Sequence, residues 1–274
     1  PITTEMIKTG IVSNDESLDE VYYSKNIKRK MIKTKPLNDF HSFVKKSLIL
    51  KNSYPTNNLI DISCGRAGDI NHWLDAQLNY IVGVDVNREN LEHIENGACN
   101  RILNNYDKTQ RMIDNILFIW GDSSQKFKDG TAAKDDLNKY YLDILHGNID
   151  LETITNNKLK GFYNLGSNNF DVVSCQFSIH YFFKDLETLN GLLENVSRLL
   201  KPGGVFIGTS LDGKNVFDIL KKNQAIMEHE EDTLLWKINK KYKDNQFNDD
   251  ETCLGYSIDV YMESIGKTFT EYLV

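Results

Sequence analysis

A glycine-containing turn at residues 58–69 is the first stretch whose residue types could bind a ligand. Its sequence, NLIDISCGRAGD, passes from apolar to small residues, as in a strand, a tight loop and the start of a helix. Glycine at Gly65 and Gly68 lets the backbone turn sharply and leaves the amides open to a ligand, which a Cβ would hinder. We therefore expect a small molecule to bind at the end of this first strand.

Asp85 ends a second apolar run, YIVGVD at residues 80–85, about one helix and one strand further on. In a doubly wound sheet, an acid at this place accepts hydrogen bonds from both hydroxyls of a ribose. The loop at 61–68 lacks the third glycine of the dinucleotide-binding fingerprint, so a pyrophosphate against the helix is the weaker interpretation. The two runs together predict a nucleoside site.

Later segments narrow this prediction to a family. Residues 61–69 resemble the first motif of S-adenosylmethionine-dependent methyltransferases, and FDVVSCQFSIHY at 170–181 is similar to a signature of messenger RNA cap guanine-N7 methyltransferases. LKPGGVFIGT at 200–209 and EYLV at 271–274 resemble two further segments of that family. The resemblance runs from about Phe40 to the last residue. It implies S-adenosylmethionine as the cofactor and the GpppN end of 5′-capped RNA as the substrate.

The resemblance also implies which residues bind the cofactor. In the family, a lysine on the helix before the first strand faces the cofactor carboxylate, and Lys45 matches it; the alternative is a plain surface lysine. An acid past the third strand accepts from the adenine amine, and Asp122 is the candidate unless it only caps the next helix. Ser63 replaces a glycine of the motif, and this replacement causes little backbone strain if the φ of Ser63 is negative. Gly65 would then be the only residue of the turn in the left-handed conformation. The full expected set is Lys45, Ser63, Gly65, Asp85, Asp122, Gln176 and Tyr181.

The cap-binding residues follow from the same resemblance. His180 would lie beside the cap guanine, although a histidine in an aromatic cluster is more often structural, and Glu271 would meet the Watson–Crick edge. His41 and Ser42 stand where the family usually has two asparagines near the RNA. The expected set is His41, Ser42, His180, Tyr181 and Glu271.

Methyl transfer to guanine N7 requires no general base, because this nitrogen has a lone pair and no proton to lose. The protein's task is to align N7, the methyl carbon and the sulfur, and such positioning can lower a barrier by roughly 7 to 11 kcal/mol. An aromatic face such as that of Tyr181 tolerates the positive charge of the sulfonium. We therefore predict no residue that acts by direct chemistry and no metal.

Composition limits the class of protein. A chain of 274 residues that is 40% hydrophobic suits one large α/β domain, and no apolar run reaches the roughly 18 to 20 residues that a bilayer requires. The four cysteines form no C-x-x-C pair, which favours reduced thiols in an intracellular protein. We therefore expect no membrane partner, with a cytoplasmic or virion location for a viral protein and a nuclear one for a cellular protein.

Basic residues are concentrated near the start of the chain. Between residues 25 and 51 there are nine Lys or Arg residues against one acid, although the whole chain carries a net charge of -7. A local basic arm on an acidic body predicts contact with a few phosphates of RNA. The alternative is a solvated surface segment.

The predicted fold is α/β and Rossmann-like, as in class I methyltransferases: a mostly parallel twisted sheet with helices on both faces and antiparallel edge strands. Residues 1–36 are expected to form a polar and basic extension, and 37–274 the methyltransferase domain. Within it, 123–169 is read as a partly helical insertion on the surface. The family's C-terminal end is absent, so its last strand is missing or supplied elsewhere. Helices are predicted at 37–49, 88–104, 185–200 and 216–222, parallel strands from Leu59 and at 80–85, 116–120, 170–175 and 205–210, and antiparallel strands at 234–242 and 254–263.

Two other functions are consistent with these residues. The chain could be a non-catalytic module that binds cap or cofactor in a capping complex, or a small-molecule methyltransferase, which would leave the basic arm and Glu271 unexplained. The Asn-, Lys- and Ile-rich composition and the start without Met favour one part of a multifunctional capping enzyme of a large DNA virus. Other capping-enzyme domains or a stimulatory subunit are then expected partners.

Overall fold

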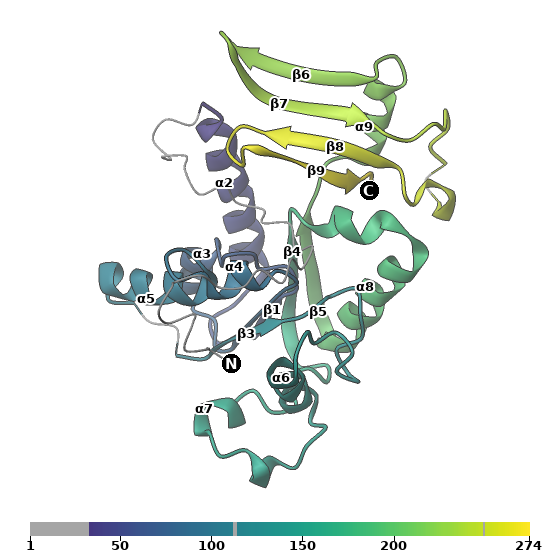
Figure 1. The fold of residues 1–274 in the computed structure, drawn as a ribbon. Coiled ribbons are helices and arrows are strands. Elements are labelled where there is room, and N and C mark those ends of the chain that lie inside the picture. Colours follow the sequence, from purple (N-terminus) through teal and green to yellow (C-terminus); the bar gives the residue numbers. More distant parts are fainter. Residues whose placement is uncertain (1–32, 112–113, 249) are drawn as a thin grey trace, which may run out of the picture.

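The computed structural model describes residues 33–111, 114–248 and 250–274, which form two β-sheets with helices between and around them (Figure 1). The basic residues of the predicted RNA-binding arm that precede Lys33, and nearly all of the extension expected at 1–36, lie outside the described residues. None of the helices in the described part of the chain is long and apolar enough to cross a membrane.

The first sheet has five parallel strands in the order β3-β2-β1-β4-β5, and this confirms the predicted α/β class. From β1 the chain adds β2 and β3 on one side, and it then adds β4 and β5 on the other side of β1. The direction in which strands are added therefore changes between β1 and β4. In open α/β sheets, ligands bind at the carboxyl ends of the strands at such a point. The strands are β1 (Leu59–Asp61), β2 (Ile81–Asp85), β3 (Ile116–Trp120), β4 (Phe170–Gln176) and β5 (Leu200–Thr209).

Helices cover both faces of this sheet, as predicted. One face packs against α2 (Lys35–Asn52), α3 (Ile70–Asp75), α4 (Arg88–Glu92) and α5 (Ala98–Thr109), which bury Ile49, Trp73, Leu91 and Ala98. The other face packs against α6 (Asp136–His146) and α8 (Leu186–Leu199). Burial on both faces explains why the strand sequences are continuous apolar runs rather than alternating ones.

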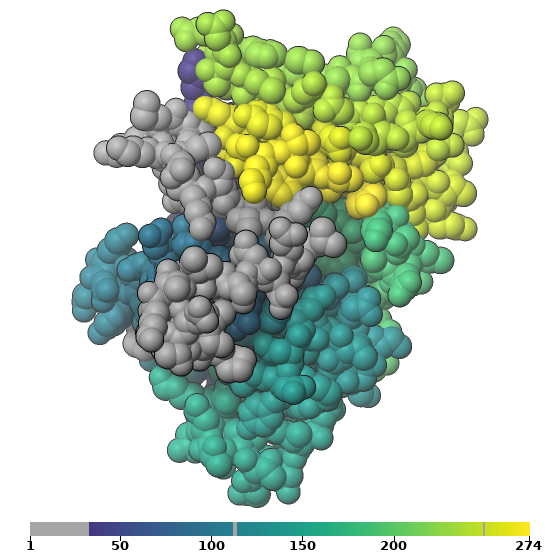
Figure 2. All heavy atoms as spheres, in the orientation of Figure 1, coloured from purple at the N-terminus to yellow at the C-terminus, as the bar shows by residue number. Residues whose placement is uncertain are grey.

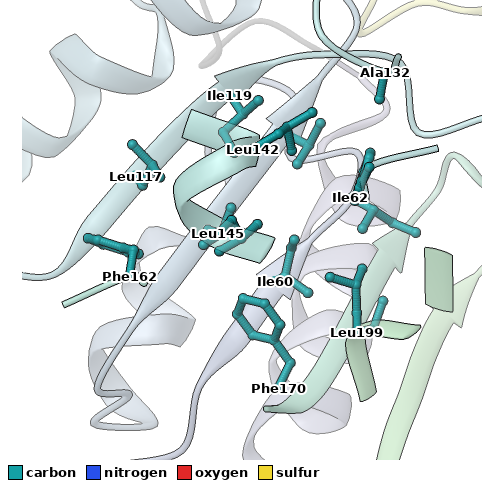
Figure 3. Packing of buried hydrophobic residues seen from close by; sticks show 14 of the residues in the cluster. Ile60, Ile62, Leu117, Ile119, Ala132, Leu142, Leu145, Phe162, Phe170 and Leu199 are labelled. Atoms are coloured by element: carbon teal, nitrogen blue, oxygen red, sulfur yellow. The ribbon is translucent and has the colours of Figure 1, made fainter. Parts of the chain in front are cut away.

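The stretch 123–169 is partly helical, as predicted. The prediction that it lies on the surface is wrong for much of its length. Leu142 and Leu145 of α6 lie in the core beside Ile60 and Ile62 of the central strand region (Figure 3). Phe127 and Ile154, outside α6, are buried in the same cluster. The stretch therefore supplies the cover for one face of the parallel sheet. It also contains the short helices η2 (Leu151–Thr153) and α7 (Asn157–Lys160).

Two predicted helices differ from the structure in detail. The helix expected at 88–104 is broken into α4 and α5, and Ile94, which lies between them, is 83% exposed. The break lies at Gly97, which packs so tightly on the backbone of residue 93 that a Cβ would lie 2.5 Å from that amide nitrogen. The helix expected at 185–200 is α8, Leu186–Leu199, in which Leu192, Asn195 and Leu199 are buried while Leu186 and Leu193 are exposed.

The predicted antiparallel strands are present, but they do not extend the edge of the parallel sheet. They form a second sheet of four strands in the order β6-β7-β8-β9, seen above the parallel sheet in Figure 1; in Figure 2 the light green to yellow atoms of this part of the chain lie at the top. This sheet is held by its own core with α9, in which Phe217, Ile238 and Ile258 are buried. Its elements are α9 (Gly213–Leu220), β6 (Ala225–Glu230), β7 (Thr233–Lys240), η4 (Glu251–Cys253), β8 (Ser257–Met262) and β9 (Lys267–Tyr272).

Candidate functional site

The glycine loop after β1 folds back onto the end of β2. Gly65 has a φ of 54°, and its amide donates a hydrogen bond to Oδ2 of Asp85 at 2.7 Å. Ser63 does not adopt a positive φ, which confirms that its side chain costs little here. Gly65 is not the only residue of the turn in the left-handed conformation, however, because Ala67 also has a positive φ, of 51°. The loop thus presents its backbone at the carboxyl end of the sheet.

Asp85 is fixed by three donors and keeps capacity for a ligand. Its Oδ1 accepts from the Asn87 amide at 2.9 Å and from Nδ2 of Asn90 at 3.0 Å. Within the described residues, Oδ2 accepts only from Gly65, although a carboxylate oxygen can accept two hydrogen bonds. Burial raises the pKa of the Asp85 carboxyl, and the three donors oppose that shift. The carboxylate is therefore held in place, with an acceptor position left for a hydroxyl group.

Lys45 reaches the same loop from α2. Its Nζ lies 2.6 Å from Oδ1 of Asp69, whose side chain is 8% exposed. A Cβ on Gly68 would stand 3.9 Å from this nitrogen, which places the ammonium beside the loop backbone. On the same helix, Oγ of Ser42 lies 3.3 Å from Nε2 of His72. Lys45 is thus not a plain surface lysine, and its positive charge lies where the carboxylate of an amino acid could approach.

Asp122 follows β3, next to the end of β2. The Gly121 amide donates to the Asp85 carbonyl oxygen at 3.0 Å, so the two acids follow adjacent strand ends. Oδ1 of Asp122 accepts from the amide and hydroxyl of Ser124, and Oδ2 lies 3.5 Å from Nζ of Lys134. The next helix, α6, has Asp135 as its N-cap, so the alternative that Asp122 caps it is wrong.

Gln176 connects three strands through a chain of polar side chains. Oγ1 of Thr209 donates to Oε1 of Gln176 at 3.1 Å, and Nε2 of Gln176 donates to Oγ of Ser174 at 3.3 Å. Ser174 in turn donates to Oδ2 of Asp61 at 3.3 Å. The Asp61 side chain is fully buried, and burial raises the pKa of its carboxyl to about 7.

Asp61, Ser174 and Thr209 were not among the predicted site residues. Each is the last residue of its strand or lies within two residues of it, at the carboxyl edge of the sheet. Asp85 was predicted from this same position. An acid at the end of β1 was therefore a usable signal for Asp61. Ser174 and Thr209 carried no comparable signal, because short polar residues in strands are common.

His180 and Glu271 meet although the chain places them 91 residues apart. His180 lies in η3 (Ile179–Lys184), just after β4, and Glu271 lies in β9 of the second sheet; Nε2 and Oε2 are 3.7 Å apart. Burial lowers the pKa of His180 to about 4 and raises that of Glu271 to about 7. Neither ring nitrogen of His180 has a hydrogen-bond partner among the described residues. Buried polar groups left without partners are uncommon, and they indicate a place for a polar ligand.

Two aromatic ring pairs lie on α2, η3 and the turn after β4. The His41 ring of α2 lies 4.3 Å from the Phe177 ring, centroid to centroid, and the His180 and Tyr181 rings are also 4.3 Å apart. Phe177 has a φ of 54°, a conformation that a bulky residue rarely adopts, and its amide donates to the Thr209 backbone and side chain. The turn after β4 is therefore held in an unusual geometry between α2 and η3.

The predicted residues thus form two neighbouring groups at the carboxyl edge of the parallel sheet. The loop residues, Lys45, Asp85, Asp122 and Gln176 lie at or beside the strand ends of β1 to β4. His180 and Glu271 form the second group, which begins four residues after Gln176 in the chain. Within the described part of the chain, no cluster of three or more His, Cys, Asp or Glu side chains is arranged to hold a metal ion.

Comparison with known proteins identifies relatives in one family. Residues 9–274 match the model of the mRNA (guanine-N(7))-methyltransferase domain. A probable mRNA-capping enzyme of Acanthamoeba polyphaga mimivirus is 30% identical over 92% of this chain and 20% of its own length. mRNA cap guanine-N(7) methyltransferase 1 of Arabidopsis thaliana is 24% identical over 69% of this chain and 42% of its own.

A solved structure of the CcbJ methyltransferase from Streptomyces caelestis aligns with a TM-score of 0.48 and 12% identity, covering 93% of this chain and 79% of that one. Against the two curated relatives described above, the chain spans a fifth and about two fifths of their lengths.

Proposed function

The chain belongs to the mRNA (guanine-N7)-methyltransferase family, and from this premise we propose that it transfers a methyl group from S-adenosylmethionine to N7 of the guanine cap of RNA. The observation that carries the proposal is the buried pair of His180 and Glu271, with unsatisfied polar atoms, next to the strand end that bears Gln176. A guanine presents N–H donors on its Watson–Crick edge, and a carboxylate is an acceptor that pairs with two of them. A small hydrophobic substrate would leave this pair without partners.

The cofactor half of the site fits S-adenosylmethionine, which carries a methyl group on a sulfonium. Asp85 retains an acceptor position for a ribose hydroxyl, and Lys45, paired with Asp69 at 2.6 Å, has further N–H donors for the amino-acid carboxylate. Asp122, past the neighbouring strand, is an acceptor suited to the adenine amine. We assign Ser63, Gly65, Gln176 and Tyr181 to the same cofactor-binding half of the site. Their tasks are to bind and orient, since S-adenosylmethionine supplies the reactive methyl group.

The cap half orients the acceptor nitrogen. With Glu271 binding the Watson–Crick edge and His180 beside the ring, N7 on the opposite edge of the purine is left free to face the bound cofactor. His41 and Ser42 on α2 are proposed to contact the capped RNA at the border of the two halves, where the His41 ring packs against Phe177. In this arrangement the residues act by alignment, which can account for a large part of the rate enhancement.

The first experiment measures transfer of a labelled methyl group from S-adenosylmethionine to GpppG, with GTP and a panel of catechols and amines as competing acceptors. We expect label on the cap guanine alone, at N7. Cofactor binding without transfer to any acceptor would indicate the non-catalytic alternative, and transfer to a small molecule would indicate the other. Either result would refute the proposal.

We also propose that the chain works as one part of a longer capping enzyme. Its similarity covers a fifth of the mimivirus protein, which leaves room for other domains in that relative. Its partners would then be the other capping domains, or a stimulatory subunit, together with the capped RNA. The native mass of the complex purified from its source tests this: the mass of a single chain of this length would contradict it.

A further inference from the structure

A basic pocket of about 460 Å³ lies at one end of the antiparallel sheet, and none of the residues assigned above lines it. Five lysines and no acidic residue line it, in a chain whose net charge is -7. The remaining lining residues include the polar side chains of Asn223, Gln224 and Asn245. The five are Lys221, Lys222, Lys240, Lys241 and Lys243, which we call the lysine pocket.

The backbone that carries these lysines is well fixed. Lys221 and Lys222 follow α9, and the Lys240 amide donates to the Gln224 carbonyl at 2.9 Å, which ties the end of β7 to the start of β6. The Tyr242 ring stacks on Phe217, with 15° between the rings, and on Tyr256, with 8°. Nζ of Lys240 lies 4.6 Å from the centre of the Tyr242 ring, and Nζ of Lys221 lies 5.1 Å from that of Phe217, so these two lysines pack on the aromatic cluster.

Part of the positive charge in the pocket is not neutralised within the described residues. Lys221 lies 3.5 Å from Asp218, and Lys241 lies 3.2 Å from Asp259. Lys222 and Lys243 are exposed and form no ion pair with any described residue. Lysine ammonium groups bind phosphate as point charges, and side-chain amides can donate to phosphate oxygens.

The strand register places the pocket near Glu271. Lys240 of β7 pairs with Ile258 of β8, and Ile258 pairs with Glu271 of β9, so the three residues form one row across the sheet. Neighbouring strands are about 4.8 Å apart, which puts the backbone of Lys240 roughly 10 Å from that of Glu271. The pocket and the proposed cap site thus share one end of the antiparallel sheet.

We propose that the lysine pocket binds the phosphodiester backbone of the RNA that follows the cap. This rests on the proposed function, since a cap held at Glu271 brings the next nucleotides to this end of the sheet. A single-stranded polyanion suits a short set of positive charges with amide donors between them. The pocket would hold capped RNA in preference to a free cap, without reading its sequence.

The test compares two double variants. K222Q/K243Q removes two unpaired charges from the pocket, and K128Q/K158Q removes two exposed charges near α6 and in α7, at the opposite end of the molecule from the antiparallel sheet (Figure 1). Both pairs are on the surface, so both proteins should fold, which thermal unfolding verifies. Fluorescence anisotropy measures binding of a short labelled capped RNA over a range of salt concentrations, and competition measures binding of GpppG.

We expect K222Q/K243Q to weaken RNA binding by up to about 25-fold near 0.1 M salt, and to reduce the slope of log K against log salt by about 1.4, because each single-strand phosphate contact contributes about 0.7. Its affinity for GpppG should equal that of the wild type. The control variant should bind RNA like the wild type.

Equal weakening in both variants, or an unchanged slope in K222Q/K243Q, would overturn the proposal. Competition by poly-glutamate as effective as that by RNA would also overturn it, because the pocket would then serve an acidic polypeptide. The anisotropy experiment measures RNA binding and does not require methyl transfer. Failure to methylate GpppG would therefore refute the proposed function, but the binding test of the lysine pocket would remain valid.

Discussion

Replacement of Glu271 by Gln offers a direct test of the proposed cap site through the pH dependence of cap binding. Burial raises the pKa of the Glu271 carboxyl to about 7, and it lowers the pKa of His180, 3.7 Å away, to about 4. His180 is therefore neutral at and above neutral pH. Of the two groups, only Glu271 changes charge near pH 7.

The expected magnitude follows from the ionised fraction of Glu271. With a pKa of about 7, roughly a tenth of the carboxyl groups are ionised at about pH 6 and roughly nine tenths at about pH 8. If the ionised form accepts from the guanine edge, the affinity for GpppG should rise about tenfold over this range, or about 1.4 kcal/mol. The sign is fixed, because at the lower pH binding must first remove a proton.

The assay is titration of GpppG into wild type, Glu271→Gln and Glu187→Gln at both pH values, by calorimetry. Glu187 is an exposed acid on α8 and serves as the matched control, which should behave like the wild type. Glu271→Gln should bind more weakly at about pH 8, by roughly 1.5 to 3 kcal/mol, because a charged acceptor is lost and the amide nitrogen cannot accept. Its affinity should not change with pH.

Two results would refute this reasoning. Wild-type affinity that stays flat across the range would mean that Glu271 does not meet the cap in its ionised form. A tenfold rise that persists in Glu271→Gln would place the titrating group elsewhere in the protein or on the ligand.

Three further predictions concern other parts of the site and the fold. Asp85→Asn should reduce affinity for S-adenosylmethionine by about 30-fold or more, since at least one hydrogen bond to a charged acceptor, worth roughly 2 kcal/mol, is lost; near-normal affinity by calorimetry would contradict the placement of the ribose. His180→Ala should keep cofactor affinity but slow methylation of GpppG, whereas equal loss of both would make His180 structural. Leu142→Ala should lower the free energy of unfolding by roughly 2 to 5 kcal/mol in urea titrations, while Leu137→Ala on the exposed side of α6 should change it little; equal effects would mean that α6 does not pack as described.

The parallel sheet could be predicted because its strands are buried on both faces and so read as apolar runs with polar ends. The strand at 116–120 was predicted with the bounds that it has in the structure. Asp85 and Gln176 could be placed because the polar residue that ends such a run lies at the ligand-binding edge. The meeting of His180 with Glu271 was implied by family resemblance, since no local pattern relates η3 to a strand of another sheet.

The errors have identifiable physical causes. The break at Gly97 carried a signal, because Asn96-Gly97 is a turn dipeptide that the periodicity of the flanking residues outweighed. No feature of the sequence indicated that the antiparallel strands form a separate sheet. Whether a strand joins an existing edge or forms a new sheet depends on which face finds a partner, here α9, and that is a matter of tertiary packing rather than of local sequence.

The helix α2 links the two halves of the site through its N-terminus. Glu263, which follows β8, accepts hydrogen bonds from the amides of Lys33 at 3.1 Å and Thr34 at 2.8 Å, where the helix leaves its first donors without internal partners. A negative charge at this end of a helix is also favoured by the helix dipole. The same helix bears Lys45 beside the loop after β1, and Figure 1 shows its first turn beside the β8–β9 hairpin. Because the sheet that carries Glu271 is attached to the helix that carries Lys45, one continuous set of contacts sets the distance between the proposed cap-binding group and the proposed cofactor-binding group. In a reaction that depends on alignment, such a connection matters as much as the residues that touch the substrates.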